Sequence, residues 1–380
     1  MILSSTINKR NIFLYLGLIV LFLTLSLTLN QIQVSNFIYT GYLFNYENEF
    51  VKRGFIGEII RLSGKPASFE LVTQIGAISL ILTTIVFFSI SFYGFRNNLT
   101  ETGAVLFILT LLTSSATLQH FYLEIGRFDV FNFFLALLCI WISFRVKSNI
   151  KYILILTLCS ISILIHEAAF LMYIPMVMGF VLYNTTTKKQ IFYLISTCLL
   201  LVTLTWAVST LGMVKKQNFE QHYLELISQY SNGHIDKGSV AVLHVTDWSK
   251  EMTASLMLLL NSESIVEHKR LLLYLGFFVL LFSIITLQDF KQNAFNRKHL
   301  ILIFAISPLT LYPFGIDYYR WWSLAINNLL VSAALLSMYN TSFKQNLIQI
   351  FYRNQVLIIL LAITSALNGP IGVNMAFQRF

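Results

Sequence analysis

Charged side chains that could do chemistry are gathered in four short polar segments between apolar stretches of the sequence. Each segment places a carboxylate near an arginine or a histidine, a combination that can hold an anion and accept a proton. In chain order the segments contain Glu47, Glu49, Lys52 and Arg53; Arg127 and Asp129; His166 and Glu167; and Asp317 and Arg320, followed by Trp322.

The basic and aromatic members of these segments predict how a substrate is held. The planar guanidinium of arginine binds phosphate oxygens through two parallel hydrogen bonds, and tryptophan rings can stack on sugar faces. We therefore expect a cavity of mixed charge for an anionic, polyhydroxylated substrate. Its predicted substrate-binding residues are Lys52, Arg53, Arg127, His166, Asp317, Arg320 and Trp322.

A second interpretation of the same residues is structural. Arg127 with Asp129, and Asp317 with Arg320, could be ion pairs that pin the ends of helices, as paired charges in membrane proteins often do. Basic residues near an interface, such as those at 52–53, also contact lipid headgroups.

Glu167 is a candidate general base on physical grounds. It follows His166 in the middle of the apolar run 152–183, which is about twice the length of one membrane crossing. We expect this run to form a hairpin broken at the His-Glu pair. Desolvation between its apolar limbs should raise the pKa of the carboxyl group and strengthen it as a base.

The composition indicates the class of fold. Hydrophobic residues make up 56% of the 380 residues and charged residues only 11%, which is typical of a polytopic, all-α membrane protein and excludes soluble enzyme folds. The net charge of +9 is scattered between apolar runs, so no nucleic acid is expected as a partner. The three cysteines lie in apolar runs, which excludes a disulfide framework and cysteine-based zinc sites.

Apolar runs predict about eleven transmembrane helices in a single membrane domain, 1–380. The first run has no cleavage site before Gln31, so we expect it to be retained as a helix. The runs are 11–30, 71–93, 104–122, 129–144, 152–165, 168–183, 191–213, 271–287, 300–313, 322–338 and 355–368.

Loop charges predict a cytoplasmic N-terminus. With that orientation, thirteen basic and two acidic residues lie inside, and thirteen basic and fifteen acidic residues lie outside, as the positive-inside rule requires. The four charged segments then share the outer face with two polar loops, 31–70 and 214–270. Within the second loop, apolar residues at helical spacing predict an amphipathic interfacial helix near 217–230.

The layout and motifs of the chain resemble those of a known family. Lys-Arg-Gly-Phe-Ile-Gly at 52–57, Gly-Arg-Phe-Asp at 126–129, the intramembrane His-Glu pair and Asp-x-x-Arg-Trp at 317–321 are similar to motifs of bacterial surface-polysaccharide proteins. The chain resembles the Wzy-type O-antigen or capsular polysaccharide repeat-unit polymerases and, more broadly, the multi-span glycosyltransferases of the GT-C type.

The resemblance implies a GT-C-like helix bundle with an outward-facing cavity, in the inner membrane of a bacterium. It implies a catalytic acid in the first outer loop, at Glu47 or Glu49, and arginines that hold a lipid diphosphate, at Arg53, Arg127 or Arg320. Combined with the argument for Glu167, we rank Glu49 and Glu167 equally as the base, ahead of Glu47 and Asp129.

The predicted function is polymerisation of polyprenyl-diphosphate-linked oligosaccharide repeat units into a surface polysaccharide such as the O-antigen of lipopolysaccharide. Membrane lipid, a flippase and a chain-length regulator are the implied partners. No cofactor or metal is required, although Glu47-x-Glu49 could bind a divalent cation with substrate phosphate. The alternatives are a GT-C transferase with a polyprenyl-phosphate sugar donor, and a flippase for lipid-linked oligosaccharide. A flippase should expose cations to both leaflets, so the clustering of charge at the outer helix ends favours an enzyme.

Overall fold

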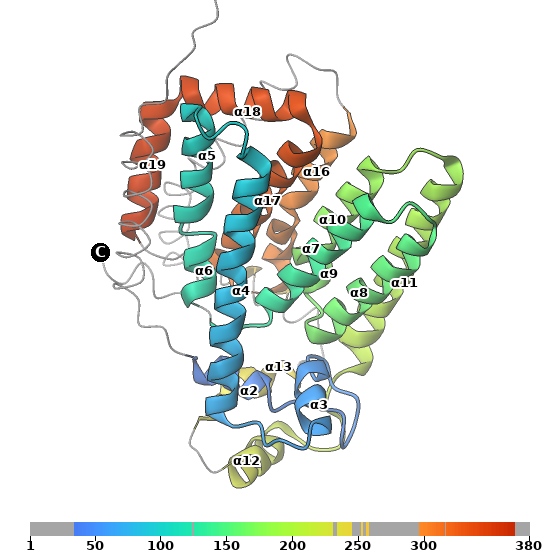
Figure 1. The fold of residues 1–380 in the computed structure, drawn as a ribbon. Helices are drawn as coiled ribbons and strands as arrows, with labels where there is room; N and C mark the ends of the chain where they lie inside the picture. The colour runs from blue at the N-terminus through green and yellow to red at the C-terminus, as the bar shows by residue number, and fades with distance from the viewer. Residues whose placement is uncertain are drawn as a thin grey trace, which may run out of the picture.

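The chain folds into a helical bundle with a smaller helical cap at one end (Figure 1). The structure, a computed structural model, describes residues 34–123, 125–230, 234–244, 252–253, 256–257, 296–315 and 317–368. All regular secondary structure in these residues is helical. The predicted runs 11–30 and 271–287, and most of the outer loop after residue 244, lie outside the described residues.

The helical structure of the described residues confirms the prediction of an all-α protein. Four helical segments among these residues are long and apolar enough to cross a membrane, which is consistent with a membrane protein. They are α4 (Phe69–Phe95), the pair α5 (Thr102–Thr113) and α6 (Leu118–Leu123), α11 (Lys188–Leu211), and α17 (Tyr318–Tyr339).

The other predicted runs within the described residues coincide with shorter helices. These are α7 (Asp129–Arg145), α8 (Ile150–Ile165), α9 (Ala169–Met172), α10 (Ile174–Tyr183), α16 (Arg297–Ala305), the 3-10 helix η1 (Ser307–Phe314) and α19 (Gln355–Asn368). An amphipathic helix, α18 (Thr341–Arg353), lies across the end of the bundle opposite the cap (Figure 1).

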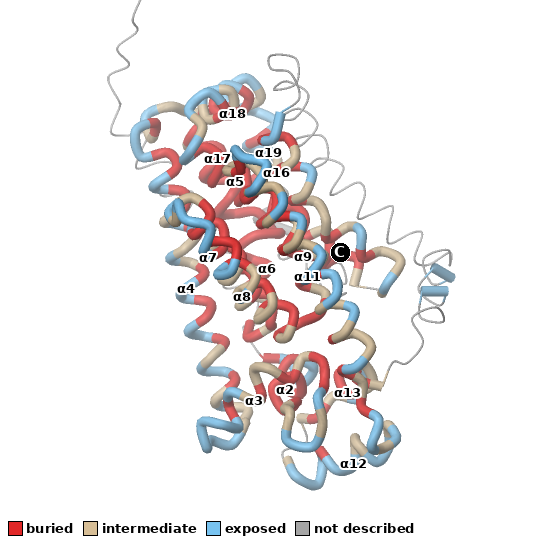
Figure 2. The backbone as a smooth tube through the Cα atoms, turned by 90° about the vertical axis from the view of Figure 1, so that its right-hand side faces the viewer, coloured by how far each residue is buried: buried red, intermediate tan, exposed pale blue. Residues whose placement is uncertain are grey.

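Burial differs sharply between the long helices. Helix α17 is almost wholly buried at the centre of the bundle, whereas α4 and α11 expose most of their apolar side chains, as Figure 2 shows. Leu199 and Trp206 on α11 and Phe92 on α4 are more than half exposed. Exposed apolar surface on this scale is unfavourable in water, so these faces are suited to contact with lipid.

The cap consists of α2 (Asn36–Gly41), α3 (Phe55–Leu62), α12 (Phe219–Gln229) and α13 (Lys237–Val242). Helix α12 lies in the segment where the sequence predicts an amphipathic helix. Asn218 caps it, since its side chain accepts a hydrogen bond from Gln221 N at 2.9 Å. Helix α13 packs against α2 and α12, so the described parts of the two polar loops lie together. Their apolar residues share one core with Val72 and Leu80 of α4 and Ile165 of α8.

The helical path of 152–183 is interrupted at the His-Glu pair. Helix α8 ends before His166, whose backbone is extended, and α9 begins at Ala169. Helix α8 packs mainly on α7 and α11, whereas α10 packs mainly on α16. The two limbs therefore share α7 and α11 as neighbours, but their main packing partners differ.

Candidate functional site

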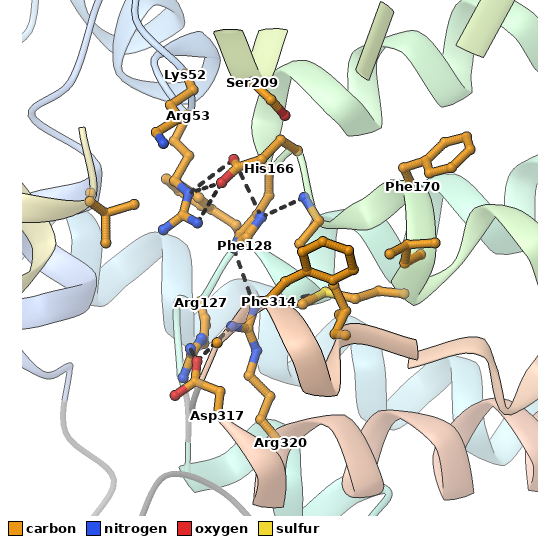
Figure 3. Close-up of a pocket in the computed structure, with 18 of the residues that line it drawn as sticks. Lys52, Arg53, Arg127, Phe128, His166, Phe170, Ser209, Phe314, Asp317 and Arg320 are labelled. Carbon is orange, nitrogen blue, oxygen red and sulfur yellow. Dashed lines mark hydrogen bonds and ion pairs between the residues drawn. The ribbon is translucent and has the colours of Figure 1, made fainter. Parts of the chain in front are cut away.

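A cavity of about 900 Å³ lies where the cap meets the bundle. Seven of the residues predicted from the sequence line it: Lys52, Arg53, Arg127, His166, Glu167, Asp317 and Arg320. Figure 3 shows their side chains converging from the loop before α3, the α6–α7 loop, the α8–α9 break and the start of α17. The four charged segments of the sequence thus meet at one place.

Arg53, which is labelled in Figure 3, forms an ion pair with Glu167. Arg53 Nη2 donates to Glu167 Oε1 at 2.6 Å, and Nε donates to Oε2 at 3.0 Å. The Arg53 side chain is 19% exposed and that of Glu167 is 7% exposed. Both hydrogen bonds are charge-assisted and together fix the orientation of the guanidinium plane. The third guanidinium nitrogen, Nη1, takes no part in this pair.

The backbone at Arg53 adopts an uncommon conformation. Its φ of 64° lies in the left-handed region, which a residue with a side chain rarely occupies. The loop is held on one side by Lys52 N, which donates to Gly212 O at 2.7 Å. Gly54 follows because a Cβ there would lie 2.6 Å from the ring of Tyr46. The strained turn directs the Arg53 side chain to Glu167.

Arg320 is held by Asp129, which lies behind the cavity wall. Arg320 Nη2 and Nε donate to the two Asp129 oxygens at 2.6 and 2.7 Å, and both side chains are almost fully buried. Asp129 is not among the residues that line the cavity. Its contact with Arg320 gives it the structural role that the sequence left as an alternative.

Asp317 bridges Arg127 and Arg320. Its Oδ2 accepts from Arg127 Nη2 at 3.1 Å and from Arg320 Nη1 at 3.2 Å. The Asp317 side chain is 37% exposed, which makes it the most accessible carboxylate of the ion-paired cluster. Burial acts to raise the pKa of Asp317, but Arg127 and Arg320 outweigh it and the net shift is downward.

The α6–α7 loop positions Arg127 through a glycine and a tyrosine. Gly126 has a φ of 82°, which places it in the left-handed region where glycine is favoured. Its carbonyl oxygen accepts a hydrogen bond of 2.6 Å from the buried hydroxyl of Tyr42 in the cap. The cap therefore fixes the loop that carries Arg127.

The expectation of a raised pKa at Glu167 is wrong. Desolvation by burial does raise it, but Arg53, His166 and Lys52 stabilise the carboxylate, so the net pKa of Glu167 lies well below its usual range. The sequence prediction considered only the apolar residues on either side of 166–167. In the folded chain the guanidinium of Arg53 also contacts Glu167. Glu167 is consequently a weak base that is already paired.

His166 is held neutral. Burial first, and then the charge of Arg53, lower its pKa to about 3. The backbone N–H of Ala168 donates to His166 Nδ1 at 3.2 Å, so the neutral ring carries its proton on Nε2. Arg320 Nη2 lies 3.5 Å from Nε2. Each ring nitrogen of His166 thus faces an N–H donor, and the neutral ring can accept from only one of them.

Glu47, Glu49 and Trp322 do not line the cavity. Glu47 is exposed, and Glu49 accepts hydrogen bonds from the backbone of Lys215 and Lys216 at the edge of the cap. The indole of Trp322 donates to the Tyr312 hydroxyl group, while Trp321 lines the cavity. The loop that carries the two glutamates thus reaches the cavity through Phe44, Lys52 and Arg53, and not through the glutamates.

The apolar wall of the cavity was not predicted from the sequence. Trp206 on α11, Phe170 on α9 and Phe314 on η1 line it, with Ser209 and Thr210. The signal in the sequence was the group of hydroxyl residues Thr205, Ser209 and Thr210 beside Trp206 in an otherwise apolar run.

Among the residues that the structure describes, no group of three or more His, Cys, Asp or Glu side chains is arranged to hold a metal ion. No protein-family model matches the chain, and no curated protein or solved structure is significantly similar to it.

Proposed function

We propose that this protein is a membrane glycosyltransferase that polymerises polyprenyl-diphosphate-linked oligosaccharide repeat units at the outer face of a bacterial inner membrane. The observation that carries the proposal is one cavity with an arginine-rich floor and apolar walls. An anionic headgroup and a hydrocarbon chain on the same molecule are complementary to those two parts.

The floor of the cavity favours an anion. Lys52, Arg53, Arg127 and Arg320 line it with only two carboxylates, Glu167 and Asp317, and Asp129 balances Arg320 from behind. The sum of these charges is positive. The pairs hold the guanidinium planes in place before the substrate arrives, so little reorganisation is needed to bind diphosphate oxygens.

The walls lead from the floor to the outer surface of the bundle. Trp206 on α11 is 67% exposed and Phe314 on η1 is 43% exposed, and both line the cavity. A hydrocarbon chain could leave the cavity between these residues and continue into lipid. This path supports a lipid-linked substrate over a free sugar nucleotide, which has no apolar tail.

The chemistry follows from the placement of the charges. The acceptor hydroxyl oxygen attacks the anomeric carbon of the donor glycan, and the bond from that carbon to the diphosphate oxygen breaks. The electron pair leaves with the diphosphate, which the arginines stabilise. The hydroxyl proton passes to Asp317, the most accessible carboxylate of the floor. Because the pKa of Asp317 is lowered, leaving-group stabilisation supplies most of the acceleration.

The arrangement of charged ends supports the orientation. The loops that join α4 to α5, α7 to α8 and α10 to α11 lie at the end of the bundle opposite the cap (Figure 1). Arg96, Lys147 and Lys188 lie in or beside these loops. With that end cytoplasmic, the cap and cavity face outward, and about eleven crossings follow if the remaining predicted runs also span.

The test is the surface-glycan ladder of a strain that lacks this gene. A polymerase predicts a single-repeat band that becomes a ladder when the wild-type gene is restored. Loss of all glycan beyond the core would instead support a single-sugar transferase or a flippase. A ladder of normal length in the deletion strain would exclude a role in polymerisation.

A further inference from the structure

Two histidines in the cap point ring nitrogens at one another, away from the charged cavity. His222 on α12 and His244, just after α13, have Nδ1 and Nε2 only 3.0 Å apart. Both residues are partly exposed, so solvent can reach them. The edge of the His244 ring faces the ring of Phe219, which restricts its rotation.

The spacing of the two nitrogens suits a shared metal ion. With metal–nitrogen bonds of about 2.1 Å, two imidazoles stand about 3.0 Å apart at a right angle and about 3.4 Å apart at the tetrahedral angle. The observed 3.0 Å lies in this range, but the ring centroids are 5.2 Å apart and the nitrogens point nearly at one another, so both rings must also rotate for their lone pairs to meet at one ion. Neutral imidazole is a favoured ligand of zinc, copper and nickel.

The electrostatic surroundings are also favourable for a cation. Glu49 acts on both rings and Glu225 acts on His222, each in the direction that favours positive charge. Glu49 is therefore placed to balance part of the charge of a bound ion.

We propose that His222 and His244 form a two-histidine site for a divalent transition metal, with water in the remaining coordination positions. The ion would join α12 to the segment that follows α13. Gly238, Ser239 and Val242 of α13 line the cavity, and the loop that carries Glu49 continues to Arg53. Metal binding would thus stabilise the cap side of the cavity without taking part in its chemistry.

Zinc binding to the full chain tests the site. The protein, purified in detergent without a histidine tag and stripped with a chelator, is titrated with ZnCl2 by calorimetry. We expect one Zn²⁺ per chain, and a loss of affinity of at least about tenfold in His222→Ala and in His244→Ala. His234→Ala is the matched control, because His234 is in the same cap but is bonded to Asn36 Oδ1 at 3.2 Å.

Thermal unfolding separates a metal site from a simple hydrogen bond. ZnCl2 should raise the unfolding temperature of the wild type and of His234→Ala, but not that of His222→Gln, in which an amide can still form a hydrogen bond. No shift in the wild type, or an equal shift in His222→Gln, would overturn the proposal. Neither assay uses glycan or measures activity. Failure of the metal-site proposal can therefore be distinguished from failure of the proposed function.

Discussion

Arg320 and Asp129 are joined by two hydrogen bonds of 2.6 and 2.7 Å, although they lie 191 residues apart in the sequence. The pair connects the start of α17 to the start of α7, and both side chains are nearly inaccessible to water. It is therefore both a support for one arginine of the cavity and a constraint on the bundle.

Removing one partner of this pair should destabilise the protein. Asp129→Asn removes the carboxylate that accepts two hydrogen bonds from the buried Arg320 and leaves Asp317, at 3.2 Å, as the carboxylate in contact with this guanidinium. Loss of one partner of a buried pair costs about 3 to 5 kcal/mol. We expect lower abundance in the membrane and a lower unfolding temperature. Arg61→Gln, which breaks the Arg61–Glu58 pair at its 40% exposed member, is the control and should change neither. Normal abundance of Asp129→Asn would contradict a structural role.

Arg53→Lys should reduce polymerisation by roughly tenfold or more, because lysine keeps the charge but loses the two-pronged contact. Glycan chain length at matched abundance measures the effect. Arg61→Lys is a close control, since Arg61 also makes two hydrogen bonds to a glutamate, Glu58, but on the outside of α3. Wild-type ladders in both Arg53→Lys and Arg53→Ala would remove Arg53 from the site.

Asp317→Asn should reduce polymerisation without abolishing it, because leaving-group stabilisation supplies most of the acceleration. We expect little loss of protein, since Asp317 is the most exposed carboxylate of the ion-paired cluster. Glu47→Gln and Glu49→Gln should polymerise normally, since neither side chain lines the cavity. Glycan ladder length and protein abundance in the three variant strains decide which carboxylate is the base. Normal ladders in Asp317→Asn together with short ladders in Glu49→Gln would indicate that Glu49 in the first outer loop, and not Asp317, is the base.

Stability should fall on acidification between pH 7 and pH 5, in part through His166. Its pKa is near 3 in the folded protein and 6.5 ordinarily, so the unfolded chain takes up a proton first and the stabilisation is lost as the pH falls below about 6.5. Glu167 and Asp317 begin to contribute only below pH 5, since their ordinary values are 4.5 and 3.8.

The measurement is the unfolding temperature of wild type and His166→Gln across this range. His222 and His244 titrate in both proteins, so the difference between the two curves isolates His166. We expect a shallower decline in the variant. Parallel curves would mean that His166 is not held neutral by its surroundings.

Cysteine labelling tests the orientation. In a background without the three native cysteines, Lys237→Cys in the cap should react with a membrane-impermeant reagent from outside, and Lys188→Cys only after permeabilisation. Both lysines are exposed, so a failure to react reports topology and not burial. The reverse pattern would place the cavity on the cytoplasmic side and overturn the proposed function.

The helices and their breaks could be predicted from the sequence because they depend on local pattern. Apolar runs predicted helices from Phe69–Phe95 to Tyr318–Tyr339, and the His166-Glu167 pair indicated the interruption after α8. Helical spacing of apolar residues marked the segment of α12. Each of these features involves neighbours within about one or two turns, where side-chain type and spacing dominate.

The ion pairs of the site were decided by tertiary structure. The sequence suggested ion pairs within single segments, and these exist. Arg127 Nε lies 3.8 Å from Asp129 Oδ2, and Arg320 Nη1 lies 3.2 Å from Asp317 Oδ2. The shortest contacts, however, join Arg53 to Glu167 and Arg320 to Asp129, each at 2.6 Å. The partners in these two pairs are 114 and 191 residues apart in the sequence. Tertiary packing brings them together, and no local sequence pattern predicts the pairing.

The pKa of Glu167 shows the same limit. Composition around 166–167 correctly indicated burial, and burial alone raises the pKa of a carboxyl group. The net direction was set by Arg53, which lies 114 residues away in the sequence. Local sequence determines how far a charge is removed from water, but only the folded chain determines which opposite charge meets it there.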